Sequence, residues 1–159
     1  MKSGLPEFVS YINRKLGFTF LYPEGWREAL SGGDLFIYPP NAREVNVSGK
    51  IIFSPCIAMR IGQKVVKNPS KFYLEFISET SNNFEGYKLL WDSPSNLSTG
   101  EKSHEWSFEY TLGYHRFTAV FIITQKHDTF FIMDGSCLKT QFGDLEATLS
   151  KIIGSLSLL

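Results

Sequence analysis

The chain lacks any long apolar run and any excess of charge of one sign. No stretch of about 18 consecutive apolar residues occurs, so the sequence predicts no membrane-spanning helix. Lysine and arginine together number 16, and so do aspartate and glutamate. Without a net charge to attract phosphate backbones, nucleic acid is not expected as a partner. Internal repeats and low-complexity tracts are also missing, so we expect a single globular domain that spans residues 1–159.

No catalytic motif occurs in the chain. The G-x-S-x-G motif of serine hydrolases is absent. Gly100-Glu101-Lys102-Ser103 lacks the first glycine of a phosphate-binding loop and precedes a predicted strand instead of a helix. Gly135-Ser136-Cys137 places a thiol after a strand, but the sequence offers no base to activate it. We therefore expect a protein that is not an enzyme, with no catalytic residue, no cofactor and no cofactor-binding residue.

Cysteine is scarce, and the first residues of the chain do not form a signal peptide. Cys56 and Cys137 are either a disulfide pair in an oxidising compartment or two small buried side chains. Residues 1–7 lack the apolar core of an export signal. The chain is therefore expected to be cytoplasmic, or exported if a signal has been removed.

Aromatic residues are abundant, at 15% of the chain with 14 phenylalanines, which favours a sheet-based core. The stretch GFTFLYPEGW at residues 17–26 alternates apolar and other residues over 18–22, as a strand does. Pro23-Glu24-Gly25 then predicts a type I turn with proline at its second position and glycine at its fourth. Trp26 is expected to fold back as an aromatic anchor.

The rest of the first two thirds predicts four more strands and one helix. Residues 41–49 are expected to form a polar loop, and Pro55 argues for an edge position or a bulge in the strand around it. Asn68-Pro69 is typical of a helix start, so a helix is predicted to run to about Asn83. The predicted strands are 8–12, 35–38, 50–61 and 87–91, and the buried face of the helix is Phe72, Phe76 and Ile77.

The last third predicts three strands joined by short turns and a closing helix. The strands cover about 103–112, 115–124 and 129–136. Short turns between consecutive strands make the sheet mainly antiparallel, so the predicted class is α+β with about six to seven strands packed between helices. The apolar stripe of the helix is Phe142, Leu145, Leu149, Ile152, Ile153 and Leu156.

The turns also predict which side chains share a face of the sheet. If Leu112 pairs with His115, the residue numbers of each pair between strands 103–112 and 115–124 add up to 227. If Gln125 pairs with Thr129, the residue numbers of each pair between strands 115–124 and 129–136 add up to 254. One face is then almost wholly apolar, while the other mixes polar and apolar side chains. Glu105, Glu109 and Asp134 are the carboxylates of this mixed face, and it is the candidate ligand face.

The three histidines are candidate metal ligands by type only. His115 and His127 are predicted at opposite ends of one strand, roughly 40 Å apart at about 3.3 Å per residue. Zinc requires each ligand nitrogen within about 2.1 Å. His104 is predicted at the strand end, on the apolar face, so no metal site is expected in the monomer.

Three segments, taken in order, resemble the PsbP-like domain family. GFTFLYPEGW is similar to its opening strand, which ends in an aromatic residue, proline, a variable residue, glycine and tryptophan. GYKLLWDSPSNLSTGEKSHEWSFEY at residues 86–110 resembles the strand, loop, glycine and strand of bacterial members. FGDLEATLSKIIGSLSL at residues 142–158 resembles the closing helix, with Ser155-Leu156 in place of a Ser-Phe pair.

The resemblance implies a PsbP-like α/β/α sandwich and a scaffold that binds other proteins. Members of the family include an extrinsic subunit of the oxygen-evolving complex of photosystem II, thylakoid-lumen relatives, a Ran-binding factor and bacterial proteins of unknown role. Some members bind divalent cations such as calcium. For a chain from a photosynthetic source, the resemblance implies the thylakoid lumen.

Two functional hypotheses follow. The first is a non-enzymatic, monomeric domain that binds a protein partner, as an assembly or stabilising factor for a photosystem or another membrane complex. Any association with a membrane would then be peripheral, through the partner. The alternative is a small-molecule or metal-ion binding module that uses Glu105, Glu109 and Asp134 on the mixed face.

Overall fold

The computed structural model describes residues 6–64 and 67–159. Its main sheet has seven strands in the order β3-β4-β7-β11-β10-β9-β8, and each neighbouring pair is antiparallel. Their bounds are β3 Arg27–Ser31, β4 Asp34–Tyr38, β7 Cys56–Gln63, β8 Lys88–Asn96, β9 Lys102–Leu112, β10 His115–Lys126 and β11 Thr129–Leu138. Smaller sheets are formed by β1 (Phe8–Asn13), β2 (Phe18–Pro23) and β12 (Ser157–Leu158), and by β5 (Arg43–Val47) and β6 (Lys50–Ser54).

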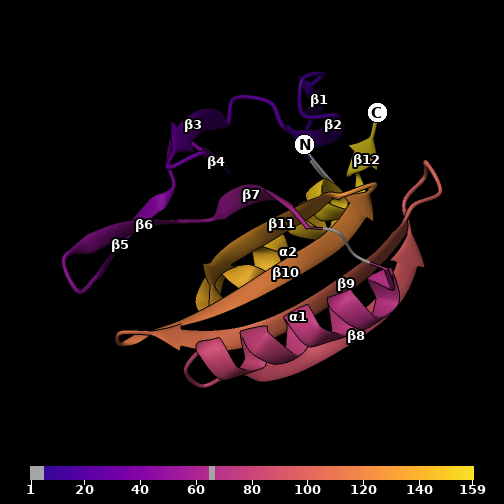
Figure 1. The fold of residues 1–159 in the computed structure, drawn as a ribbon. Helices are drawn as coiled ribbons and strands as arrows, with labels where there is room; N and C mark the ends of the chain where they lie inside the picture. The colour runs from indigo at the N-terminus through magenta and orange to yellow at the C-terminus, as the bar shows by residue number, and fades with distance from the viewer. Residues whose placement is uncertain (1–5, 65–66) are drawn as a thin grey trace.

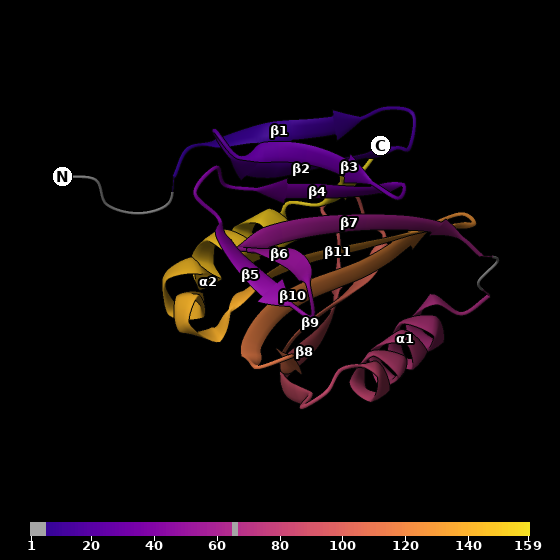
Figure 2. The same cartoon turned by 90° about the vertical axis from the view of Figure 1, so that its left-hand side faces the viewer.

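The two helices cover opposite faces of the main sheet. Helix α1 (Pro69–Asn83) packs against β9 and β10, and α2 (Lys139–Gly154) lies behind β10 and β11 (Figure 1). A turned view shows β1 and β2 on the same side of the sheet as α2 (Figure 2). The α+β class and the seven-stranded antiparallel sheet between helices are thus confirmed. Neither helix within the described residues has the length and apolar character needed to cross a membrane.

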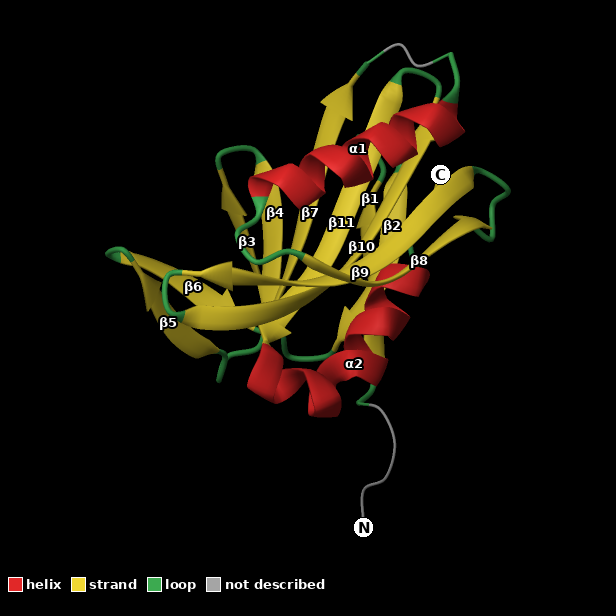
Figure 3. Cartoon of the chain, turned by 90° about the horizontal axis from the view of Figure 1, so that it is seen from below, coloured by secondary structure: helices red, strands yellow, loops and turns green. Residues whose placement is uncertain are grey.

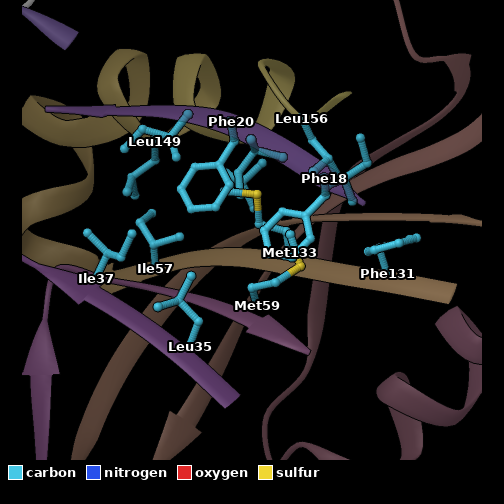
Figure 4. Packing of buried hydrophobic residues seen from close by; sticks show 14 of the residues in the cluster. Phe18, Phe20, Leu35, Ile37, Ile57, Met59, Phe131, Met133, Leu149 and Leu156 are labelled. Atoms are coloured by element: carbon cyan, nitrogen blue, oxygen red, sulfur yellow. The ribbon is translucent and has the colours of Figure 1, made fainter. Parts of the chain in front are cut away.

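The core on the α2 side is built by the stripe that the sequence predicted. Leu149, Ile152, Ile153 and Leu156 are all buried, and Phe142 and Leu145 pack at the margin of the same cluster. They meet Phe18 and Phe20 of β2 and the inward side chains of β4, β7 and β11 (Figure 4). The stretch GFTFLYPEGW therefore has a packing role, because its buried aromatic side chains lie in the core beside α2.

The core on the α1 side is aromatic. Asn68 caps the helix as predicted, because its side chain accepts a hydrogen bond from the Lys71 backbone N–H at 3.2 Å. Tyr73 and Ile77 are the buried apolar residues of the helix, whereas Phe72 and Phe76 are only partly buried against the same cluster. The helix is confirmed from end to end, and its buried face is rotated slightly toward Tyr73.

Residues 41–61 differ from the prediction. The predicted loop contains β5, and the predicted single strand is divided at the cis Ser54–Pro55 bond into β6 and β7. Strand β7 lies inside the sheet, between β4 and β11, so Pro55 marks a break and not an edge. The β5–β6 hairpin extends to one side of the main sheet (Figure 3) and buries Val45 in the α1-side core.

Three smaller expectations are also corrected. The turn predicted at Pro23-Glu24-Gly25 begins at Pro23, whose carbonyl accepts a hydrogen bond from the Trp26 N–H at 3.2 Å. Gly25 is therefore the third residue of this turn and not the fourth, and its φ is +89°. Glycine is favoured at that place because it adopts positive φ freely. Strand β3 was not predicted, because Arg27–Ser31 lacks an apolar alternation. Strand β8 runs past the predicted stop at Asp92 to Asn96, with an irregularity at Leu90.

Candidate functional site

The predicted ligand face is not assembled, because the pairing of β10 with β11 differs by one residue from the prediction. The β9–β10 pairs sum to 227 as predicted, but the β10–β11 pairs sum to 255, as in Phe121 with Asp134. A shift of one residue moves every side chain of a strand to the opposite face. Asp134 therefore lies on the α1 face, and Glu105 and Glu109 lie on the α2 face.

Glu109 is held in an ion cluster beside the start of α2. Its Oε1 accepts hydrogen bonds from Lys139 Nζ at 3.2 Å and Arg116 Nη2 at 3.3 Å. Burial of Glu109 raises its pKa, but the hydrogen bond and charge of Lys139, the hydrogen bond of Arg116 and the charge of Lys88 outweigh burial and hold the pKa below its usual value. This carboxylate is already neutralised, so it serves structure better than catalysis.

Glu105 and Asp134 have raised pKa values because burial disfavours their charged forms. For Asp134 the pKa is raised to about 7, against the opposing charge of Arg60. Asp134 pairs with Phe121 of β10 on one side and with Ala58 of β7 on the other, and both neighbours are apolar. The strand pairing therefore places no second carboxylate beside Asp134. A single carboxyl group on a packed face destabilises the fold when it is charged. It does not form the pair of carboxyl groups that acid–base catalysis would use.

The Asp134→Asn variant is expected to be more stable than the wild type at pH 8. A carboxyl whose folded pKa is raised from 3.8 to about 7 loses stability as pH rises through that window and bears the full cost above it. Since one pKa unit corresponds to about 1.4 kcal/mol, we expect a gain of at least about 1 kcal/mol at pH 8 relative to pH 4. Urea unfolding at both pH values measures it, and an equal effect at both would contradict the assignment.

The cysteines lie on opposite faces of the sheet and are both free. Cys56 pairs with Ser136, the chain neighbour of Cys137, and adjacent residues of a strand point to opposite faces. Burial raises the pKa of each thiol to about 12. Of the two alternatives for the cysteines, separate thiols are confirmed, and neither is a ready nucleophile.

The histidines are not brought together. His115 and His127 lie at the two ends of β10, as predicted, and His127 adopts φ +56° in the second turn. His104 is 5% exposed on the α1 face, and its Nε2 lies 3.4 Å from Asp92 Oδ2. Within residues 6–64 and 67–159, no three His, Cys, Asp or Glu side chains are grouped to hold a metal ion.

Two of the pockets that open between the described residues are large enough to consider as sites. The first, of about 430 Å³, lies between α2 and the loops around Trp26, Pro39 and Pro55. Ser54 is buried in it, and its Oγ donates to Gln141 and accepts from the Leu138 N–H, so it is satisfied. The second, of about 370 Å³, lies between the first turn of α1 and the end of β8, and His104 lines it.

The outer edge of β8 is the feature that sequence reasoning missed. Every residue of the strand is exposed, and among the described strands only β9 pairs with it. Leu89, Leu90 and Trp91 are 44%, 39% and 40% exposed. Their apolar character alone predicted a strand, but not that both helices would leave it uncovered. Three adjacent apolar side chains on a free edge form a surface on which another chain can pair.

Solved structures place this architecture among known folds. Cyanobacterial PsbP (CyanoP) from Synechocystis sp. PCC 6803 matches with 14% identity and a TM-score of 0.67, over 98% of this chain and 95% of that one. LpqN, involved in cell envelope biogenesis of Mycobacterium tuberculosis, matches with 13% identity and a TM-score of 0.68, over 96% and 90%. The Saccharomyces cerevisiae Ran-binding protein Mog1p matches with 8% identity and a TM-score of 0.60, over 97% and 96%.

These likenesses confirm the PsbP-like fold that the three sequence segments predicted. At such low identities they establish the fold alone. No protein-family model matches the chain, and no curated protein matches it either.

Proposed function

We propose that this chain is a non-enzymatic domain that binds a protein partner at the outer edge of β8. The exposed strand with Leu89, Leu90 and Trp91 at the end of the sheet carries the proposal. An extended segment of the partner adds to β8 as an eighth strand, and its backbone hydrogen bonds supply affinity. The apolar side chains on either side of the edge supply specificity.

The partner segment is short. Pro94 has no N–H to donate and interrupts the edge, and the irregularity at Leu90 twists it locally. The usable edge therefore runs over about Lys88 to Ser93. Lys88 and Asp92 give it one positive and one negative charge, so the segment is expected to be apolar with a carboxylate near one end and a cation near the other.

We propose that the domain acts as an assembly or stabilising factor of a larger complex, such as a photosystem or another membrane complex. The support is the fold: it is shared with a cyanobacterial PsbP and with a Ran-binding protein. No residue of this chain singles out one complex, so the partner is to be identified by affinity capture from the native cell.

Substitution of the edge tests the proposal with the captured partner in purified form. Leu89→Lys combined with Leu90→Lys is expected to weaken binding at least about ten-fold, because two charges would have to be buried in an apolar contact. Leu30→Lys is the matched control: Leu30 is 78% exposed on β3, at the opposite edge of the same sheet. Equal binding by both variants, with unchanged melting temperatures, would contradict the site.

A further inference from the structure

The pocket of about 430 Å³ beside α2 is built by one face of the helix and by three loops. Its volume falls within the range of small-molecule sites. Trp26 lies just before β3, Pro39 follows β4, and Pro55 lies between β6 and β7, so the loops bring together segments that are far apart in the chain. The helix contributes four residues at spacings of zero, three, four and seven, which place them on one face. These residues are Gln141, Asp144, Leu145 and Thr148.

Trp26 gives the pocket an aromatic wall. Its backbone N–H closes the turn that begins at Pro23, so the position of the residue is fixed by the backbone. Its side chain packs in part against the α2-side core and is only half-buried. Pro39 and Pro55 extend this wall, and neither proline has a flexible side chain. The pocket therefore has a rigid apolar surface on its loop side.

The helix side of the pocket is polar, and its inner groups are neutral. Thr148 is 7% exposed, and its hydroxyl has no hydrogen-bond partner among residues 6–64 and 67–159. Its oxygen is not one of the unpaired buried atoms that are closed to solvent, so it is open to the pocket. Gln141 accepts a hydrogen bond from Ser54 through Oε1, which leaves its amide N–H groups to donate. Asp144 is exposed at the mouth and adds an acceptor.

This lining disfavours three classes of ligand. Among the described residues that line the pocket, none is a cation, and Asp144 repels an anion. A wholly apolar ligand would cover the Thr148 hydroxyl and the Gln141 amide without giving either a partner. A cation would gain little, because the carboxylate of Asp144 is exposed and its attraction is weakened by water. A neutral ligand with an apolar face and several hydrogen-bonding groups is favoured.

We propose that this pocket binds the pyranose ring of a neutral sugar. One face of such a ring carries C–H groups, which pack on Trp26 because the face of an indole is electron-rich. Its hydroxyl groups both donate and accept, so they match Thr148, Gln141 and Asp144 together. The pocket lies at the β4 and β7 side of the sheet, whereas the proposed partner edge is β8 at the other end. The two sites are therefore independent.

Titration of the ¹⁵N-labelled protein with D-glucose, D-galactose and D-mannose, each separately, tests the proposal. At least one sugar is expected to shift the indole N–H signal of Trp26 and the amide signals of Gln141 and Thr148 saturably, with a Kd of about 1–10 mM. Glycerol, which has hydroxyl groups but no ring, should not saturate these shifts. Saturation by glycerol, saturation by tetramethylammonium chloride but by no sugar, or no saturation at all would overturn the proposal.

Substitutions in the pocket locate the site. Trp26→Leu is expected to weaken sugar binding at least about ten-fold and Thr148→Val about three-fold, since they remove the aromatic face and one hydrogen bond. Asp144→Ala is expected to weaken it about five-fold, while Glu146→Ala, which removes an exposed carboxylate of α2 outside the pocket, should leave Kd unchanged. Melting temperatures show which variants are folded. If Thr148→Val or Asp144→Ala were folded and bound the sugar as tightly as Glu146→Ala, the pocket would not be the site.

Discussion

Replacement of Leu149 by alanine is expected to lower the free energy of unfolding by about 2–5 kcal/mol, the usual cost of truncating a packed leucine. Leu149 is fully buried at the centre of the α2-side core. Its side chain occupies the space over Gly135, where an added Cβ would lie only 3.0 Å from Leu149 Cδ2. The helix therefore approaches the sheet closely here, and a cavity left by alanine cannot collapse further.

Urea unfolding measures this loss. Leu30→Ala is the control, since Leu30 is 78% exposed and its truncation should change stability by less than about 0.5 kcal/mol. A loss below about 1 kcal/mol for Leu149→Ala would mean that α2 is peripheral to the fold.

Replacement of Trp106 by alanine is expected to cost about 3–5 kcal/mol, because it empties the centre of the aromatic core under α1. Trp106 is fully buried, stacks on Phe121 with ring centroids 5.0 Å apart, and meets Phe76 of α1 edge to face at 6.0 Å. Aromatic pairs add to the burial of area, so several contacts are lost together.

Trp106→Phe separates packing from polarity. The indole Nε1 is buried without a hydrogen-bond partner among the described residues, so its removal relieves an unpaired donor. We expect Trp106→Phe to cost clearly less than Trp106→Ala in thermal or urea unfolding. If both variants lost the same stability, the space left by the ring would not be the cause of the loss in Trp106→Ala, and the packing account of this core would be wrong.

The sequence predicted elements well where local signals were complete. Asn68-Pro69 fixed the start of α1, and the stripe through Leu149 fixed the buried face of α2. The β9–β10 register followed from the short turn at Gly113-Tyr114, where Gly113 takes φ +58°. Each of these features depends on residues close together in the chain.

The candidate ligand face failed because it depended on one turn without such a signal. Lys126 pairs with Thr129, so the β10–β11 loop has two residues, His127 and Asp128, and His127 adopts φ +56°. Glycine or asparagine is the usual residue in that conformation, and histidine gives no such indication. The sequence pairing of Gln125 with Thr129 predicts a loop of three residues, 126–128, and this difference of one residue alone moves Asp134 to the other face.

The exposed edge of β8 and the pocket at His104 were beyond local reasoning for another reason. The run Leu89-Leu90-Trp91 has the composition of a buried strand, and His104 was expected only at the margin of the core. Which strands the helices cover depends on the packing of α1 and α2 over the whole sheet. Exposure of this kind is a tertiary property, and no spacing in the sequence encodes it.

Backbone hydrogen exchange on the complex with the captured partner tests the central claim most directly. If a partner segment adds to the outer edge of β8, those amides of residues 88–93 that point away from β9 gain protection when the partner is added, because their N–H groups become paired. Amides of β3, the opposite edge of the sheet, should be unchanged. Protection confined to β3 or to the pocket beside Trp26, with β8 exchanging as in the free protein, would contradict the account.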